Sequence, residues 1–249
     1  MTPFQALILG AVQGITEFFP VSSSAHLLVL PRLLGWDSQP LYFDTSVHLA
    51  TGLVILYFFR ARWLTLLKEK DYQKIYWLIL AAIPAGLVGF FAEGLIEKYL
   101  RLPVVVIFQL AFVSLLMLLA NSQLGGTGTW SLKRLLYIGL SQILALVPGT
   151  SRSGITITMG ILSGFSRRAA VEASFLVGLP VIMGAGIYEG VKNLTEITTN
   201  WEVVTLGFFS ALLTGLLALH FLVKILDRYS LKPFVVYRIL LAVGLIFLL

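Results

Sequence analysis

The stretch QGITEFFPVSSSAH at residues 13–26 decides the fold of this chain, because it sets polar and ionisable side chains between two short apolar arms. The arms cover residues 4–15 and 27–34, whereas a helix needs about 20 apolar residues to cross a bilayer. Pro20 lacks a backbone donor and ends the helix before it. Unpaired backbone inside a membrane persists only where protein or a water-filled cavity surrounds it. The stretch therefore predicts a re-entrant hairpin, two helices that enter the membrane halfway and turn back.

The composition indicates a polytopic membrane protein. Of the 249 residues, 12% are charged and 58% are hydrophobic, against about 25% and 45–50% in an average soluble domain. These values exclude a soluble globule, intrinsic disorder and a coiled coil. The chain has no cysteine, so a disulfide-stapled domain, a thiolate nucleophile and a cysteine-bound metal are excluded as well. We attribute the net charge of +6 to basic cytoplasmic loops and expect no nucleic-acid partner.

A second stretch, VPGTSRSG at residues 147–154, repeats this design between apolar arms at 135–147 and 155–162. Further echoes follow in the same order, with GAVQ at 10–13 matching GLSQ at 139–142 and DTSV at 44–47 matching EASF at 172–175. We therefore treat residues 1–249 as a single integral-membrane domain with one repeat at about 1–122 and another at about 130–249.

Six apolar segments are long enough, or nearly so, to cross the membrane. They cover residues 42–59, 76–92, 104–120, 169–188, 203–223 and 234–249. Each half thus contains one hairpin and three spans, and an odd number of spans places the two halves in opposite orientations. The predicted fold is an all-α polytopic membrane protein with an inverted-topology repeat, six transmembrane helices and two re-entrant hairpins.

The distribution of basic residues predicts the orientation. Twelve of the 18 Lys and Arg residues lie in the loops around 60–74, 133–134, 167–168 and 224–232, and four lie on the opposite side. Because cytoplasmic loops are enriched in Lys and Arg, the first side is predicted to be cytoplasmic. A multi-pass protein of the cytoplasmic (inner) membrane follows, with both termini and the opening of the site on the outer face.

The first hairpin turn has the chemistry of an anion site. Gln13 and Glu17 are four residues apart and share one face of the first helix. The returning helix can be capped by a serine, and its free N–H groups and positive dipole end attract an anion. His26 lies near the first turn of that helix. The candidate phosphate ligands in this turn are Ser22, Ser23 and Ser24.

The second hairpin turn has the same arrangement and adds a positively charged side chain. Arg152 can bind a phosphate through its planar, bidentate guanidinium group. The candidate hydroxyl donors around it are Thr150, Ser151, Ser153 and Thr156. Since the two hairpins are predicted to meet in mid-membrane, the sequence predicts one phosphate site with catalytic side chains.

Each of these residues also has a structural alternative. Glu17 and Arg152 are consistent with a salt bridge that ties the hairpins together, and the hydroxyls are consistent with plain helix caps. A structural role is the alternative for His26. For three residues near span ends we favour either a structural role or a supporting role behind the residues of the site, namely Asp44, His48 and Glu172. Arg238 lies a few residues into the last span, and its side chain is expected to reach the membrane interface.

The two polar stretches, together with EASFL at 172–176 and PFVVYR at 233–238, resemble the bacitracin-resistance family of undecaprenyl-diphosphate phosphatases. The resemblance implies hydrolysis of a C55 isoprenyl diphosphate to its monophosphate, which recycles the lipid carrier for peptidoglycan and other cell-wall glycans and confers resistance to the antibiotic bacitracin. It also implies a divalent cation and a homodimer. Carried over by motif, the essential residues are Glu17, His26 and Arg152, with Ser23, Ser151 and Thr156 as further site residues.

This sequence departs from the family pattern at two places. Gln13 stands where many members have glutamate, and Ser24-Ala25 stands where Thr-Gly is common. The expected cation is Mg²⁺ or Ca²⁺, held by Glu17 with Gln13, because both ions prefer oxygen ligands. The glutamine weakens a site in which two acids hold the metal.

Three nucleophiles are consistent with these residues: Ser23 activated by His26 or Glu17, a water molecule, or His26 itself. We favour Ser23, with His26 protonating the leaving lipid phosphate. The main rival function is a transporter that flips the polyprenyl phosphate across the membrane, because broken helices in inverted repeats are typical of transporters. An ion or phosphate channel is a weaker rival.

Overall fold

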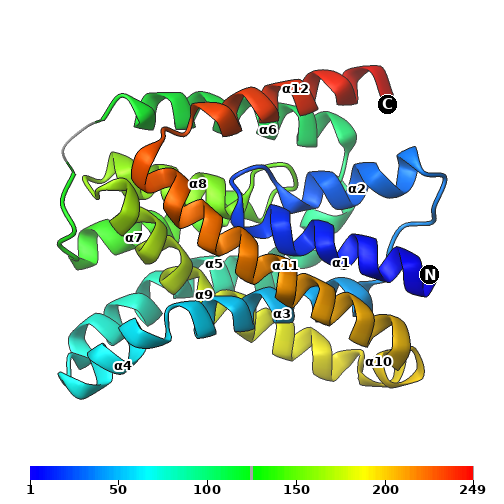
Figure 1. Ribbon diagram of the computed structural model, residues 1–249, viewed down its shortest axis with the longest axis horizontal. Helices are drawn as coiled ribbons and strands as arrows, with labels where there is room; N and C mark the ends of the chain where they lie inside the picture. The colour runs from blue at the N-terminus through cyan, green and yellow to red at the C-terminus, as the bar shows by residue number, and fades with distance from the viewer. Residues whose placement is uncertain (124–125, 249) are drawn as a thin grey trace.

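The computed structural model describes residues 1–123 and 126–248, and the chain within them is helical, with one isolated bridge between Thr127 and Phe165 (Figure 1). In the first half the helices are α1 (Pro3–Phe18), α2 (Ser23–Leu33), α3 (Leu41–Phe58), α4 (Arg60–Lys68), α5 (Tyr72–Tyr99) and α6 (Pro103–Asn121). In the second half they are α7 (Leu132–Ala145), α8 (Arg152–Leu162), α9 (Arg167–Lys192), α10 (Leu194–Thr199), α11 (Trp201–Arg228) and α12 (Lys232–Leu248).

Five helices of the described chain are long and apolar enough to cross a membrane, namely α3, α5, α6, α9 and α11. The prediction of an all-helical protein with several membrane spans is therefore confirmed. The sixth predicted span, 234–249, corresponds to α12, which has 17 residues and packs against α6. Its last predicted residue, Leu249, lies outside the described residues.

The four short apolar arms form two helix–turn–helix hairpins, α1–α2 and α7–α8. Helix α1 ends at Phe18, before Pro20, and α7 ends at Ala145, before Pro148. Each returning helix is capped by a serine in the left-handed region, where L-residues are strained by about 1–3 kcal/mol. Ser22 has φ of 75° and caps α2, and Ser151 has φ of 69° and caps α8. The expected serine caps are confirmed, while their backbone strain was not foreseen.

The hairpins enter the bundle from opposite ends, and their turns meet near its centre (Figure 1). Helix α1 packs along α11, and α7 packs along α5. Gly10 on α1 and Gly139 on α7 make these close approaches possible, because a Cβ atom at either position would collide with backbone of Gly207 or Ala81, respectively. Both chain ends and α10 lie at one end of the bundle, and α4 lies at the other.

Candidate functional site

A buried ion pair joins the two hairpins. Glu17 lies in the last turn of α1 and Arg152 is the first residue of α8, and Arg152 Nη2 lies 3.0 Å from Glu17 Oε1. The other carboxylate oxygen, Oε2, accepts hydrogen bonds from Ser23 Oγ at 2.8 Å and from Gln13 Nε2 at 3.0 Å. His48 Nε2 on α3 is 3.9 Å from the same oxygen. The structure thus brings together four of the residues that the sequence singled out.

Hydroxyl groups tie the two turns to each other. Ser24 Oγ accepts a hydrogen bond from the backbone N–H of Gly149 at 3.1 Å, and Ser153 Oγ donates to Phe19 O at 3.2 Å. Within each turn the serines pair in the same way, Ser22 with Ser24 at 3.1 Å and Ser151 with Ser153 at 3.2 Å. The N-terminal ends of α2 and α8 therefore face one space, and both present the positive ends of their dipoles to it.

Arg238 corrects the expectation drawn from its place in the sequence. The side chain does not reach the membrane interface but is fully buried, with 0% of its surface exposed. Its guanidinium donates to Pro20 O in the first turn at 3.5 Å and to Gly149 O in the second at 3.1 Å. It also donates to Gln109 O on α6 at 3.1 Å. Because α12 packs against α6, Arg238 points inward and binds both turns at once.

His26 contacts the first hairpin turn and helix α12. Its Nδ1 is 2.7 Å from Ser22 O, and its Nε2 is 2.6 Å from the hydroxyl of Tyr237 on α12. A carbonyl oxygen only accepts, so Nδ1 carries the proton and, in the neutral ring, Tyr237 donates to Nε2. Among the described interactions, His26 contacts neither Glu17 nor Arg152, the two residues with which the motif groups it.

The two candidate threonines are buried close to Arg152. Thr156 Oγ1 donates to Arg152 O at 2.6 Å and pairs with Ser174 Oγ of α9, which fixes the first turn of α8. Thr150 Oγ1 is buried without a hydrogen-bond partner. A buried polar group without a partner is rare in folded proteins, and ligand contact is one explanation for it.

A cavity of about 350 Å³ opens beside the ion pair. Its polar wall includes Glu17, Ser23, Ser24, Ser151 and Arg152, and His26 is not among its lining residues. Several further polar residues line it that sequence reasoning did not place there: Asp44, His48, Arg101, Gln142 and Glu189. His48 carried the clearest missed signal, because an ionisable residue within an apolar span is functional by default.

Carboxylate oxygens, which hard divalent cations prefer as ligands, line this cavity through Glu17, Asp44 and Glu189. The described residues contain no group of three His, Cys, Asp or Glu side chains arranged to hold a metal. Gln13 Oε1, beside Glu17, and Asp44 Oδ1 are buried acceptors without a hydrogen-bond partner. Mg²⁺ is commonly held by one or two carboxylates together with substrate phosphates. Glu17 could supply such a carboxylate, whereas Gln13 is fully buried and is not among the residues that line the cavity.

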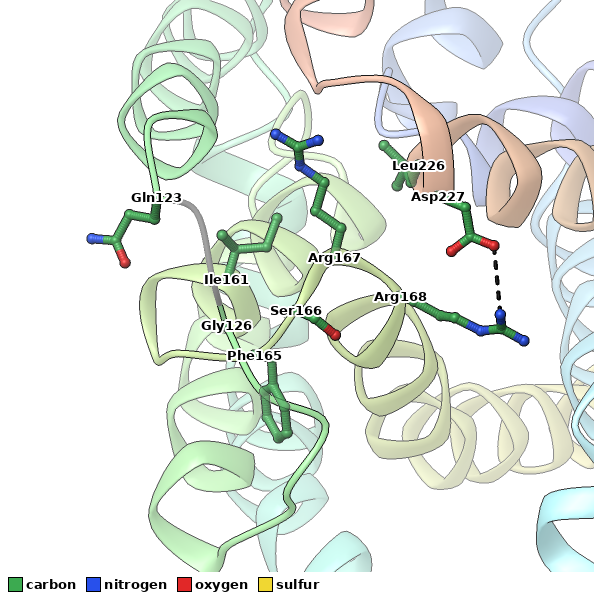
Figure 2. A pocket seen from close by; sticks show the side chains of 9 residues that line it. All are labelled: Gln123, Gly126, Ile161, Phe165, Ser166, Arg167, Arg168, Leu226 and Asp227. Carbon is green, nitrogen blue, oxygen red and sulfur yellow. Dashed lines mark ion pairs between the residues drawn. The ribbon is translucent and has the colours of Figure 1, made fainter.

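A second cavity, of about 270 Å³, lies near the start of α9 and is also lined by charged side chains (Figure 2). Arg168 points toward Asp227, with Nη1 and Oδ2 3.7 Å apart, while Arg167 points away from this pair. The ion pair offsets one of the two cations. Asp227, the carboxylate that lines this cavity, is exposed, whereas Glu17 in the central cavity is buried beside Ser23 and Arg152. The central cavity is therefore the better candidate.

The chain is similar to known proteins along nearly its whole length. Residues 6–244 match the family model described as Bacitracin resistance protein BacA. The chain is similar to the undecaprenyl-diphosphatase of Alcanivorax borkumensis, with 41% identity over 98% of each chain. It is also similar to undecaprenyl-diphosphatase 2 of Stutzerimonas stutzeri, with 38% identity over 100% of this chain and 98% of the relative. The undecaprenyl-diphosphatase of Thioalkalivibrio sulfidiphilus is 39% identical over 100% of this chain and 99% of its own.

Proposed function

The chain belongs to the bacitracin resistance protein BacA family, and from this premise we propose that it hydrolyses undecaprenyl diphosphate to undecaprenyl phosphate and inorganic phosphate. This enzyme recycles the lipid carrier of cell-wall glycan synthesis and gives resistance to bacitracin. The observation that carries the proposal is the convergence of Glu17, Ser23 and Arg152 from two hairpins at one cavity. A pure transporter of the lipid monophosphate is not favoured, because the relatives named above are diphosphatases.

The proposed topology has six spans and two re-entrant hairpins in inverted repeats, at about 1–122 and 130–249. The entry of α1–α2 and α7–α8 from opposite ends of the bundle supports it. The basic segment of α4 lies at the end opposite to the chain termini. By the positive-inside rule, both termini and the opening of the cavity then face the outer side of the cytoplasmic membrane.

Arg152 and the two helix N-termini hold the diphosphate in this proposal. Arg152 uses one guanidinium nitrogen for Glu17, and its Nη1 is buried without a hydrogen-bond partner. That donor is free for a phosphate oxygen, in the charge-assisted geometry that arginine favours. The N-terminal amides of α2 and α8 add dipoles that are already oriented toward the developing negative charge, so they stabilise the transferring phosphoryl group without reorganisation.

Ser23 is the proposed nucleophile. Its hydroxyl donates to Glu17 Oε2 at 2.8 Å, so Glu17 can take the proton as Ser23 Oγ attacks the terminal phosphorus. The new Oγ–P bond forms as the bridging P–O bond breaks, and undecaprenyl phosphate leaves. Water then attacks the phosphoserine, inorganic phosphate departs, and the proton returns from Glu17 to Ser23. His26 supports this turn by donating to Ser22 O.

Glu17 and Gln13 Oε1 are the residues that would hold a divalent cation. A bound Mg²⁺ or Ca²⁺ would offset phosphate charge and favour departure of the lipid phosphate. In this structure Gln13 Nε2 donates to Glu17 Oε2, so Gln13 Oε1 points away from that carboxylate, and the amide group would have to turn over for both residues to bind one cation.

The test is phosphate release from undecaprenyl diphosphate by detergent-purified protein, with and without EDTA. Glu17→Gln keeps the shape of the side chain and removes the base, so release is expected to fall at least about 100-fold. Glu202→Gln, at an exposed position of α11, is the matched control. Wild-type protein that releases no phosphate under any condition would overturn the proposed function, and full activity in EDTA would overturn only the cation.

A further inference from the structure

An apolar groove lies beside the central cavity. It has a volume of about 450 Å³ and runs between α5 and α9. Five residues line both spaces and so form a shared wall: Ala85, Leu146, Val181, Ala185 and Glu189. Beyond that wall the groove is lined by Gly86, Gly89 and Phe90 on α5 and by Pro180, Gly184 and Tyr188 on α9. The polar cavity and the apolar groove therefore lie next to each other, on two sides of the same five residues.

Small residues make this groove concave. A Cβ atom built at Gly86 or Gly184 would have no neighbour within 4 Å, and one at Gly89 would face only Leu146 at 3.5 Å or more. These glycines are thus not required by tight helix packing, unlike Gly10 and Gly139. A larger side chain at Gly86 or Gly184 would enter the groove without displacing the backbone.

A second apolar groove lies between α3 and α11 and provides a comparison. It is larger, about 630 Å³, and is lined by residues such as Leu53, Leu56, Leu212 and Leu216. It shares no lining residue with the cavity around Glu17. Apolar surface facing lipid is expected on any membrane protein, so volume alone does not identify a site. The five lining residues that it shares with the cavity around Glu17 distinguish the α5–α9 groove.

We propose that the α5–α9 groove binds the first isoprene units of the substrate's lipid tail, so that the substrate enters sideways from the bilayer. The inference rests on the proposed function. A diphosphate held by Arg152 must direct its apolar chain away from the charged wall, and the groove is the apolar exit that shares walls with that cavity. A branched apolar chain that comes from the bilayer can exchange lipid contacts for van der Waals packing there, because the lining is almost entirely apolar.

The first test fills the groove. Gly184→Leu and Gly86→Leu are expected to raise KM for undecaprenyl diphosphate at least 10-fold, while turnover of a five-carbon isoprenyl diphosphate stays within about twofold of wild type. Gly244→Leu is the matched control, because Gly244 lies on α12 and a Cβ there also has no neighbour within 4 Å. An unchanged KM for the long substrate in both groove variants would overturn the proposal.

The second test does not depend on whether the variants fold. Wild-type protein is irradiated with an isoprenyl diphosphate that carries a diazirine on its second isoprene unit, and the labelled peptides are identified by mass spectrometry. Labelling of α5 around Gly86–Phe90 and of α9 around Pro180–Tyr188 is expected, with competition by unlabelled substrate. Labelling confined to α3 and α11 would refute the groove. Absence of phosphate release from any diphosphate by wild-type protein would instead reject the function on which the inference rests.

Discussion

Replacing Arg238 tests how the two hairpin turns are held together. The side chain is fully buried and donates to Pro20 O and Gly149 O, one carbonyl in each turn. Among the described hydrogen bonds, neither carbonyl has another donor. The described residues also offer no carboxylate in a salt bridge with Arg238, so its charge is balanced by carbonyl and hydroxyl dipoles alone. Arg238→Met removes the donors and the charge but keeps an unbranched apolar side chain.

The expected loss of stability follows from the two carbonyls. A buried acceptor without a partner costs about 1–3 kcal/mol, so two cost about 2–6 kcal/mol by the same rule. Removing a buried, unpaired cation offsets part of this, which leaves a net loss of about 2–4 kcal/mol. For a chain of this size, 1 kcal/mol shifts Tm by about 2–4 °C, so Tm should fall by about 4–16 °C.

The assay combines thermal unfolding in detergent with phosphate release. Arg238→Met is expected to show the lower Tm and at least a 10-fold loss of kcat/KM, because the same turns present Glu17 and Arg152. Arg238→Lys keeps the charge but loses the planar fork, and an intermediate effect is expected. Arg32→Met, at an exposed position on α2, is the control. An Arg238→Met protein with the Tm and activity of wild type would refute the role of Arg238 as the link between the turns.

Three further changes test other parts of the site. Ser23→Ala removes the proposed nucleophile and is expected to lower phosphate release at least about 100-fold, so near-normal turnover would favour attack by water. Tyr237→Phe removes the donor to His26 Nε2. It should lower kcat by about 2- to 13-fold, the equivalent of about 0.5–1.5 kcal/mol. A loss of kcat as large as that of His26→Ala would show that Tyr237 does more than orient the ring. Gly139→Val forces branched carbons into the backbone of Ala81 and should lower the Tm sharply. Gly244→Val is the control and should not lower it, because a Cβ at Gly244 has no neighbour within 4 Å. Equal melting temperatures of the two variants would contradict the close packing of α7 on α5.

The elements set by local chemistry could be predicted from the sequence. Pro20 and Pro148 marked the hairpin turns because proline removes a donor, and Ser22 and Ser151 were expected among the caps because free amides need acceptors. The pairing of Glu17 with Arg152 was the structural alternative named from sequence, and the structure contains it beside a cavity. The Glu17–Arg152 ion pair therefore joins the two hairpins and also lines the candidate site.

The direction in which a side chain points from its helix could not be predicted in this way. Arg238 was expected at the interface because it is near the start of a span, but the packing of α12 on α6 turns it toward the two turns. His26 was grouped with Glu17 and Arg152 because the family resemblance carried the three over by motif, yet its ring faces Tyr237 on α12. His48 was expected to have a structural role or to support the site from outside, and α3 presents it to the cavity itself. In each case tertiary packing, not local sequence, decides the direction of the side chain.

The central claim is that two hairpin turns from the two halves of the chain form one phosphatase site. The most direct measurement is phosphate release from undecaprenyl diphosphate by purified Arg152→Gln protein, compared with wild type at matched thermal stability. The second turn contributes Arg152, whose guanidinium group binds the diphosphate in this account. The value of kcat/KM is therefore predicted to fall at least about 100-fold, or roughly 2.7 kcal/mol of transition-state stabilisation. A folded Arg152→Gln protein that releases phosphate within threefold of the wild-type rate would contradict the claim.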